Sequence, residues 1–455
     1  MLRQDATMRY VLNIIYACLL IVLSPAIAYA SIRHGKYRDG LTEKLFGLVP
    51  KLEPNTNRIW FHAVSVGEVS LLAKLVAGLN EQAPDVEIVI STTTKTGFDL
   101  AQQKYPDHIV FFCPLDFSWA VKNAFDRIQP SLFCLAELEL WPNLLMEAGN
   151  RHVPVAIVNG RLSDASFRGY RRLGGLIKSW MSNVQLVTAQ SEQCAERFVE
   201  LGVDAGLVHA VGSLKFDGAQ TNRDNEQTKR LRQLAGIGSS DVVFVAGSTQ
   251  APEEEIALHV YQDLVAKFPR LRLILVPRHP ERFDEVARML DKERVPFVRR
   301  SELNEKVPST ARVLLVDTVG ELGGWWGCAD IGFVGGSMGS RGGQNMIEPS
   351  AYGVATCFGP NTKNFRAVVG QLIQNEAARV VDSEEELRAF VELCLSDSEL
   401  RTALGERARR LVLSQRGATD KTIGLLLQLL GVRLLQHAET ENSPVAGPFP
   451  QRRSA

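Results

Sequence analysis

The chain has 455 residues, of which 45% are hydrophobic and 22% are charged. This length is typical of two or three domains, and the composition is that of a globular protein. Acidic and basic residues number 51 each, so no overall positive charge favours nucleic acid as a partner. The seven cysteines include no C-x-x-C pair, which argues against a disulfide framework or structural zinc and favours a reducing compartment.

The first predicted element is an uncharged apolar stretch at residues 10–32. A helix of this length can cross a hydrocarbon core of about 30 Å. Ala28-Tyr29-Ala30 would suit a signal-peptide cleavage site, which is one alternative. A half-inserted helix is another, because Asn13 and Pro25 weaken the span. Basic residues after the stretch outweigh those before it, which favours an uncleaved anchor over residues 1–33 and a cytoplasmic body. These basic residues are Arg33, His34, Lys36, Arg38 and Lys44.

After this stretch, short apolar runs alternate with helical patterns. Because the runs are continuous, they are typical of strands buried on both faces of a parallel sheet. In the first half, the predicted strands are residues 58–64, 86–91, 109–112, 132–135, 155–158, 186–189 and 208–211. In the second half, they are residues 242–246, 271–276, 313–316, 331–334 and 355–358.

The same patterns predict the domain organisation. We expect a first lobe at residues 34–217, a polar linker at 218–240 and a second lobe at 241–436. Residues 437–455 mix Pro, Ser, Gly and Arg without periodicity, which is typical of a disordered tail. The predicted fold class is α/β, with two doubly wound Rossmann-like lobes.

Charged side chains follow three predicted strands of the first half. Glu68 lies in the first turn of a helix, where it is either a residue stabilised by the helix dipole or a general base. Glu137 and Glu139 are two residues apart and therefore share one face, where two like charges are costly without a partner or a function. Lys215 could oppose them or form an ordinary ion pair.

In the second half, a glycine-rich loop at residues 335–343 leads into a helix that starts near Asn345. Glycines let the backbone approach an anion, and a helix start offers free N–H groups. The alternative is a tight turn with a capping box made by Asn345 and Glu348. Arg278 follows another strand and could either clamp a phosphate or pair with a local carboxylate.

Ligands of open α/β sheets bind at the carboxyl ends of the strands, so Glu68 and Glu348 together suggest a cleft between two lobes. Gly320, after a further strand, could touch a base or ribose through its backbone. The chain contains no D-x-D, G-x-G-x-x-G or P-loop motif, which argues against the usual metal–diphosphate and dinucleotide sites. A transferase without a metal would need helix N-termini and Arg or Lys to offset phosphate charge.

These segments resemble the 3-deoxy-D-manno-octulosonic acid (Kdo) transferases of lipopolysaccharide synthesis. In the first half the matching runs are His62-Ala-Val-Ser-Val-Gly-Glu68, Thr92-Thr-Thr-Lys-Thr-Gly97, Glu137-Leu-Glu-Leu-Trp-Pro-Asn143 and Asn159-Gly-Arg-Leu-Ser163. They continue with Gly212-Ser-Leu-Lys-Phe-Asp217, Val276-Pro-Arg-His-Pro-Glu-Arg-Phe283, Asp317-Thr-Val-Gly-Glu-Leu322, and Gly335-Gly-Ser337 through Asn345 and Glu348. The runs span nearly the whole chain in family order.

The resemblance implies a GT-B fold, with an acceptor-binding N-terminal lobe and a CMP-binding C-terminal lobe. The family moves Kdo from CMP-Kdo to a lipid A precursor (lipid IVA) and inverts the anomeric centre, and no cofactor or metal is implied. By motif position, Glu68 corresponds to the general base, and Glu137 and Lys215 to residues that stabilise the transition state. The residues implied to bind CMP are Pro277, Arg278, Val319, Gly320, Glu321, Asn345, Met346, Ile347 and Glu348.

An anchor with a basic flank suits a phosphorylated, acylated acceptor in the cell inner membrane. We therefore expect the inner membrane as a partner and the catalytic body on its cytoplasmic face. Two other functions stay open at this point. One is a UDP-sugar epimerase of similar two-lobed build, and the other is a membrane-tethered binding protein for anionic solutes.

Overall fold

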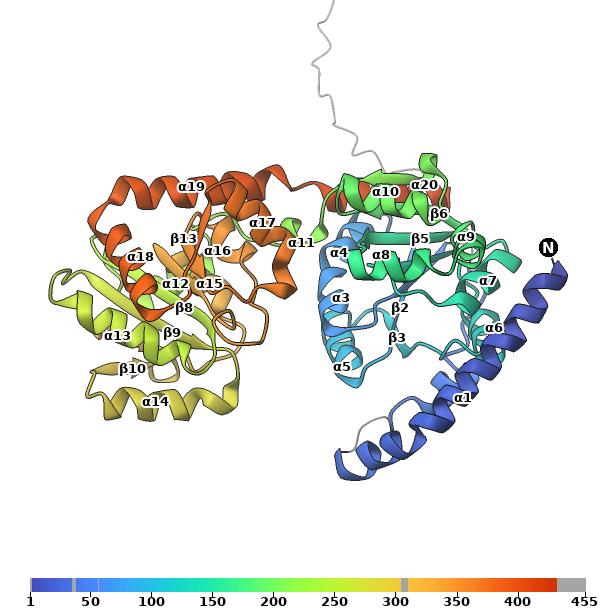
Figure 1. Cartoon of the computed structure of the whole chain (residues 1–455), viewed down its shortest axis with the longest axis horizontal. Coiled ribbons are helices and arrows are strands. Elements are labelled where there is room, and N and C mark those ends of the chain that lie inside the picture. Colours follow the sequence, from blue (N-terminus) through green and yellow to red (C-terminus); the bar gives the residue numbers. More distant parts are fainter. Residues whose placement is uncertain (1, 35–37, 56, 304–309, 432–455) are drawn as a thin grey trace, which may run out of the picture. The chain divides into compact units, whose positions relative to one another are not determined.

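The computed structural model describes residues 2–34, 38–55, 57–303 and 310–431. The described residues form two compact units. The first contains the chain up to Val211 and again from Thr419 onward, and the second is Gly212–Ala418. Each unit is built around one seven-stranded sheet with helices on its faces (Figure 1). The expected pair of doubly wound α/β lobes is therefore confirmed, whereas Lys36 and the expected tail at 437–455 lie outside the described residues.

The first sheet is parallel throughout and has the strand order β3-β2-β1-β4-β5-β6-β7. Its strands are β1 (Arg58–His62), β2 (Glu87–Thr92), β3 (Ile109–Phe112), β4 (Leu132–Ala136), β5 (Val155–Gly160), β6 (Val184–Ala189) and β7 (Val208–Ala210). All seven were expected. The order reverses between β1 and β4, and the carboxyl ends of two such strands flank the usual ligand position of an open α/β sheet.

Helices connect these strands and bury their apolar faces. They are α2 (Leu41–Phe46), α3 (Val66–Leu71), α4 (Ala73–Gln82), α5 (Lys95–Lys104), α6 (Ser118–Ile128), α7 (Pro142–Asn150), α8 (Asp164–Arg171), α9 (Gly175–Met181) and α10 (Glu192–Glu200). Trp60 of β1 is fully buried. Its ring lies 5.5, 5.2 and 4.8 Å from the rings of Phe111, Phe125 and Phe133, measured between centroids. This aromatic cluster joins β1, β3, β4 and α6, so it fixes the strands that carry the first candidate site.

The second sheet is also parallel and has the order β10-β11-β9-β8-β12-β13-β14. Its strands are β8 (Val242–Thr249), β9 (Leu271–Pro277), β10 (Phe297–Arg299), β11 (Val313–Leu315), β12 (Ile331–Val334), β13 (Ala355–Phe358) and β14 (Ala378–Val380). The sequence predicts five of them. The two that it misses, β10 and β14, are three-residue strands at the two edges, and only one of their six residues is buried. They therefore lack the apolar run that marks a central strand.

The helices of the second unit include one in the expected linker. They are α11 (Leu214–Asp217), α12 (Glu226–Leu234), α13 (Glu253–Val265), α14 (Phe283–Lys292), α15 (Leu322–Cys328), α16 (Ile347–Ala351), α17 (Arg366–Gln374), α18 (Glu384–Ser396) and α19 (Ser398–Ser414). The segment at 218–240 contains α12, whose Leu231 and Leu234 are buried in the core of this unit. This part of the chain is thus packed rather than extended between the units.

The last described helix, α20 (Ala418–Leu430), belongs almost entirely to the first unit. A Cβ atom on Gly78 of α4 would lie only 2.5 Å from Cδ1 of Ile423, so the two helices are in close contact. This arrangement differs from the expected lobes at 34–217 and 241–436. An amphipathic helix shows in its sequence which face is buried, but it does not show which sheet it covers.

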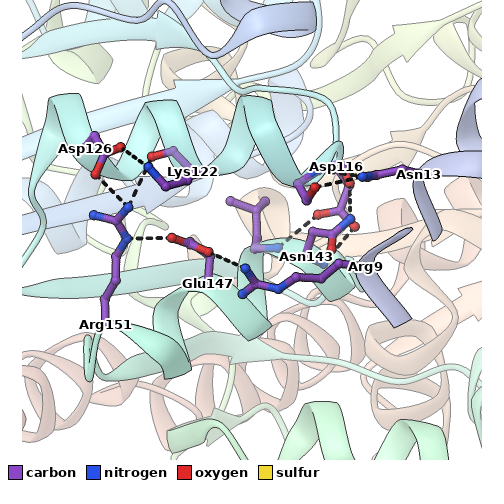
Figure 2. Close-up of polar contacts among 10 residues, drawn as sticks. Arg9, Asn13, Asp116, Lys122, Asp126, Asn143, Glu147 and Arg151 are labelled. Atoms are coloured by element: carbon purple, nitrogen blue, oxygen red, sulfur yellow. Dashed lines mark hydrogen bonds and ion pairs between the residues drawn. The ribbon is translucent and has the colours of Figure 1, made fainter. Parts of the chain in front are cut away.

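The N-terminal helix α1 (Leu2–His34) lies along the outside of the first unit, beside α6 and α7 (Figure 1). Asn13 accepts a hydrogen bond from the Ser118 backbone N–H at 2.9 Å and donates one to its hydroxyl at 2.7 Å. The Tyr16 hydroxyl donates to buried Asp116 at 3.0 Å, and Leu12 is buried. Asp116 in turn accepts two backbone N–H groups at the start of α7. Figure 2 shows the contacts of Asn13 and Asp116. Together with Tyr16 and Leu12, they dock the first part of α1 on the unit.

Among the described residues, α1 is the one helix long and apolar enough to cross a membrane, over Thr7–Arg33. Of the basic residues expected to flank it, Arg38 donates to Ser31 near the end of the helix. Lys44 instead donates to the Asp39 carbonyl and lies over the ring of Phe112, 4.1 Å from its centroid. Lys44 is therefore part of the first unit rather than a free membrane-facing charge.

Candidate functional site

In the first unit, three carboxylates gather where β1 and β4 end. Glu68 follows β1 in the first turn of α3, and Glu137 and Glu139 follow β4. Burial is the largest cause that raises the pKa of Glu68, and the charges of Glu137 and Glu139 raise it further. The residues singled out in the sequence are thus brought together at the reversal point of the first sheet.

Glu68 is held by its own turn. Its Oε2 accepts the backbone N–H of Val64 at 2.7 Å, and its Oε1 accepts the Ser65 hydroxyl at 3.1 Å. These bonds favour the ionised form, but burial opposes it more strongly, and the pKa of Glu68 rises to about 7. A partly buried carboxylate with this pKa is half ionised near neutral pH, which suits a general base. The helix-start alternative describes how Glu68 is held, but it does not explain the raised pKa.

Glu137 takes an unusual backbone conformation, with φ of 60°. Its N–H donates to the Val158 carbonyl at 2.9 Å, and its Oε1 accepts the side-chain amide of Asn159 at 3.4 Å. Asn159 is itself fully buried and has φ of 56°. Left-handed backbone at a non-glycine residue costs free energy and is often found at functional sites. The fold therefore fixes Glu137 and turns it away from a regular strand path.

Two further groups line this end of the sheet. Burial raises the pKa of Glu139 above its usual range. His62, at the end of β1, is fully buried, and burial lowers its pKa to about 4. Its Nδ1 lies 2.9 Å from the Ser91 hydroxyl, and its ring is 6.3 Å from that of Trp141, between centroids. His62 is therefore a neutral packing residue at neutral pH that supports the segment between Glu137 and Trp141.

In the second unit, Arg278 and Glu348 lie within electrostatic reach of each other. Burial raises the pKa of Glu348, while the positive charge of Arg278 lowers it. The Asn345 amide donates to Glu348 Oε1 at 3.0 Å and accepts the Ile347 backbone N–H at 3.0 Å. The Asn345–Glu348 pair thus shares features of the expected cap, yet Arg278 is exposed and its charge acts on Glu348. An exposed guanidinium beside a hydrogen-bonding carboxylate suits a ligand with both phosphate and hydroxyl groups.

The glycine-rich loop does bind an anion, but that anion is part of the protein. Gly336, Ser337 and Met338 donate their backbone N–H groups to the Glu253 carboxylate at 2.7, 2.9 and 3.0 Å. The Gln250 N–H donates to the same carboxylate at 2.9 Å. The expectation that these loop N–H groups meet a ligand is therefore wrong. The role of Glu253 could not be predicted from the sequence, because it depends on a loop more than 80 positions away.

Glu253→Ala should unfold the second unit at lower denaturant concentration. Glu253 is 1% exposed, so the change leaves four backbone N–H groups without their acceptor. We expect a loss of about 3–5 kcal/mol in the free energy of unfolding, measured by urea titration with circular dichroism. Glu255→Ala is the matched control, because Glu255 is exposed on the same helix. Equal effects of the two changes would contradict this role.

The turn after β11 exposes main-chain atoms at its tip, whereas its charged side chain is bound within the protein. Arg300 binds Glu321 with two hydrogen bonds, at 2.8 and 2.7 Å, and the Thr318 hydroxyl donates to it at 2.7 Å. The Glu321 carboxylate therefore has partners inside the protein. Val319 is 77% exposed, and a Cβ atom on Gly320 would meet nothing within 4 Å. A flat group such as a base could lie against this tip, as expected for Gly320.

The remaining predicted residues either have buried side chains, so that only their main chain is available to a ligand, or lie on a helix next to the one that carries Glu348. The side chains of Pro277, Met346 and Ile347 are buried in the second unit, so only their main chain can contact a ligand. Lys215 belongs to α11, whose Phe216 packs in one cluster with Ile347 of α16. Lys215 thus lies in the second unit, on a helix next to the one that carries Glu348. The expectation that it belongs to the first lobe does not fit this division.

Comparisons with known proteins match both parts of the chain. Residues 39–218 match the family model described as 3-Deoxy-D-manno-octulosonic-acid transferase (kdotransferase). A 3-deoxy-D-manno-octulosonic acid transferase of Haemophilus influenzae is 33% identical over 419 residues, covering 90% of this chain and 97% of the relative. Among solved structures, the C-terminal CMP-Kdo binding domain of WaaA from Acinetobacter baumannii is 31% identical over 41% of this chain and 96% of its own, with a TM-score of 0.38.

A further solved structure bears on the fold. UDP-GlcNAc 2-epimerase from Neisseria meningitidis, bound to UDP-GlcNAc, has a TM-score of 0.57 and covers 82% of this chain and all of its own. Its sequence identity is only 10%. The likeness to the epimerase therefore concerns the two-lobed fold alone.

Proposed function

Since the chain belongs to the family of Kdo transferases, we propose that it moves Kdo from CMP-Kdo to a lipid A precursor, with inversion at the anomeric carbon. It is an enzyme of lipopolysaccharide synthesis with a GT-B-like fold. In this proposal the first unit binds the acceptor and the second binds CMP. The observation that supports it most is the position of Glu68 beside Glu137 and Glu139, where burial, with a further contribution from these two charges, raises its pKa to about 7.

The proposed reaction is a single displacement. Glu68 accepts the proton of an acceptor hydroxyl while that oxygen forms a bond to the anomeric carbon of Kdo. The bond from that carbon to the phosphate oxygen breaks, and CMP leaves with the electron pair. Attack from the face opposite CMP inverts the carbon, and the base contributes typically 10²- to 10⁴-fold to the rate.

The second unit would offset the charge of the leaving phosphate. Arg278 is exposed and can donate from a planar fork to phosphate oxygens. Lys215, on the neighbouring helix, would add a second positive charge. Glu348 and Asn345 would bind hydroxyl groups of the ribose, and the tip at Val319 and Gly320 would lie against the base.

Glu137 is proposed to act on the acceptor side, as a fixed negative charge beside the reacting centre. A Kdo ring with a developing positive charge at its anomeric carbon would be stabilised by such a carboxylate. Glu137→Gln should therefore lower kcat while the KM for CMP-Kdo stays near its original value. The control is Glu192→Gln, on the exposed start of α10. An unchanged kcat would contradict the assignment.

The helix α1 is proposed to anchor the enzyme in the inner membrane, with the catalytic body on the cytoplasmic face. Its apolar composition and the basic residues that follow it support this orientation. The acceptor is an amphipathic lipid, so an enzyme held at the membrane would meet it where it resides.

The test uses the full chain in detergent with CMP-Kdo and tetra-acylated lipid A precursor. We expect release of CMP only when both substrates are present, and a lipid product heavier by one or more Kdo units in mass spectra. CMP release without a heavier lipid would mean hydrolysis rather than transfer. Conversion of a UDP-sugar without any acceptor would instead support the epimerase alternative.

A further inference from the structure

A cavity of the first unit lies where α1 crosses α6 and the end of α7. Its volume is about 800 Å³, and its lining includes Arg9, Tyr10, Asn13, Trp119, Lys122 and His152. None of the proposed catalytic residues lines it. Three of the lining residues are basic types, and no acidic residue is among them. The cavity is therefore suited to an anion that plays no part in the transfer step.

The charges beside this cavity form a chain of ion pairs with an excess of cations (Figure 2). Arg9 pairs with Glu147 at 2.8 Å, and Arg151 pairs with both Glu147 and Asp126 at 2.7 Å. Lys122 pairs with Asp126 at 3.0 Å. Three cations thus share two carboxylates. Asp116 also acts on Arg9, but burial raises the pKa of Asp116 to about 7, so near neutral pH it offsets only part of the remaining positive charge.

Two cations of the lining have further capacity to bind an anion. Two of the Arg9 guanidinium nitrogens, Nε and Nη2, are buried and have no hydrogen-bond partner among the described residues. The Lys122 ammonium has its side chain 62% exposed, so it can reach a ligand in the cavity while Arg151 retains Asp126. A buried donor without a partner costs free energy until a ligand or water satisfies it.

The cavity is continuous with the apolar surface that α1 exposes. Tyr10 and Ile14 line it and are 70% and 64% exposed, and Trp119 is 46% exposed. Tyr and Trp are enriched where membrane lipid meets water, because each has an apolar body and a polar group. A ligand here would thus have its charged group on the basic residues and an apolar part along α1.

We propose that this cavity binds the phosphate group of an anionic glycerophospholipid of the membrane, with the acyl chains along the exposed face of α1. The bound lipid would hold α1 on α6 and set the height of the first unit at the membrane surface. Lys122 and His152 would contact the phosphate directly, and Arg9 would join them from α1. The same residues offer little to a zwitterionic headgroup, whose positive charge they would repel.

Native mass spectrometry of the full chain in detergent tests the proposal. The probes are dioleoyl phosphatidylglycerol and dioleoyl phosphatidylcholine at equal concentration. We expect the anionic lipid to be retained at least fivefold more, and Lys122→Glu to reduce that retention at least fivefold. Lys104→Glu is the matched control, because Lys104 is exposed on α5 of the same unit, away from the cavity. His152→Ala is a milder second variant that leaves every ion pair of the network in place.

Two further experiments distinguish a phospholipid site from a simple anion site and from an acceptor site. Inorganic phosphate and glycerol 3-phosphate should not displace the lipid at millimolar concentration. Displacement by either would show a simple anion site and overturn the lipid proposal, as would equal retention of the two lipids or no effect of Lys122→Glu. The KM for detergent-dispersed acceptor should be unchanged in Lys122→Glu. A raised KM would mean that the cavity binds the acceptor, which would also overturn the proposal without affecting the assignment of Glu68.

Discussion

Glu68→Gln should lower kcat for Kdo transfer by about 10²- to 10⁴-fold, the range found when a general base is removed. The amide has the size of the carboxylate and can still accept the Val64 N–H, so the turn should keep its shape. Affinity for CMP, measured by calorimetry, should stay unchanged because the proposed nucleotide residues are in the other unit. Glu81→Gln, an exposed change on α4, is the control and should be active. Full activity of Glu68→Gln would rule out the proposed base.

The pH dependence follows from the same group. A base must be ionised, and the pKa of Glu68 is about 7, so kcat/KM should rise as the pH rises through about 7 and level off above it. Removal of Glu137 or Glu139 should shift this rise to lower pH, because both charges raise the pKa of Glu68. A profile that is flat between pH 5 and 8 would contradict the assignment.

The free energy of unfolding should change with pH in the direction opposite to kcat/KM. The pKa of Glu68 is higher in the folded protein than the ordinary 4.5, so folding favours the protonated form. The stabilisation of the folded protein by protonated Glu68 is fully present below about pH 4.5 and is lost as the pH rises through about 7. The melting temperature of Glu68→Gln minus that of the parent protein should therefore be larger at pH 8 than at pH 5. A change that improves stability and abolishes activity is typical of a residue retained for chemistry.

Arg278→Ala should weaken the binding of CMP by about 10- to 100-fold, because a hydrogen bond to a charged phosphate contributes about 1.5–3 kcal/mol. Arg278 is exposed and, among the described residues, hydrogen-bonds only through its backbone N–H, to the Thr249 carbonyl, so the fold should tolerate the change. Arg278→Lys should recover part of the affinity, since it keeps the charge but loses the planar fork. Titration calorimetry with CMP, in the absence of acceptor, measures the effect.

The matched control for this site is Arg270→Ala. Arg270 is also exposed, and it lies directly before β9, whereas Arg278 lies directly after it. The two changes remove the same charge from opposite ends of one strand. Long-range attraction for CMP would be weakened by both, whereas a direct contact would be lost only in Arg278→Ala. Equal losses of affinity would therefore contradict the proposed phosphate contact.

The sequence predicted the parts of the fold that depend on local pattern. Central strands such as β1 and β9 are continuous apolar runs, and the polar residues that follow them could be located from the same pattern. Edge strands such as β14 were missed because two of its three residues are exposed and its side chains carry no such signal. Arg300, which binds Glu321, and Glu253, which binds the glycine-rich loop, were also missed. Their partners come from distant segments, so the contacts exist only once the chain has folded.

The docking of α1 limits how deeply the proposed anchor could enter a bilayer. The helix packs against the first unit at Met8, Leu12 and Tyr16, and residues 17–32 of the apolar stretch follow this docked part. At about 1.5 Å per residue these cover about 24 Å, less than the roughly 30 Å of a hydrocarbon core. The chain is again part of the first unit at Lys44, which keeps the basic segment after α1 on the side of the catalytic body. A docked α1 would therefore lie in one leaflet rather than cross the bilayer. The enzyme would then be monotopic, with its globular part pressed against the headgroups on the side where sugars are added.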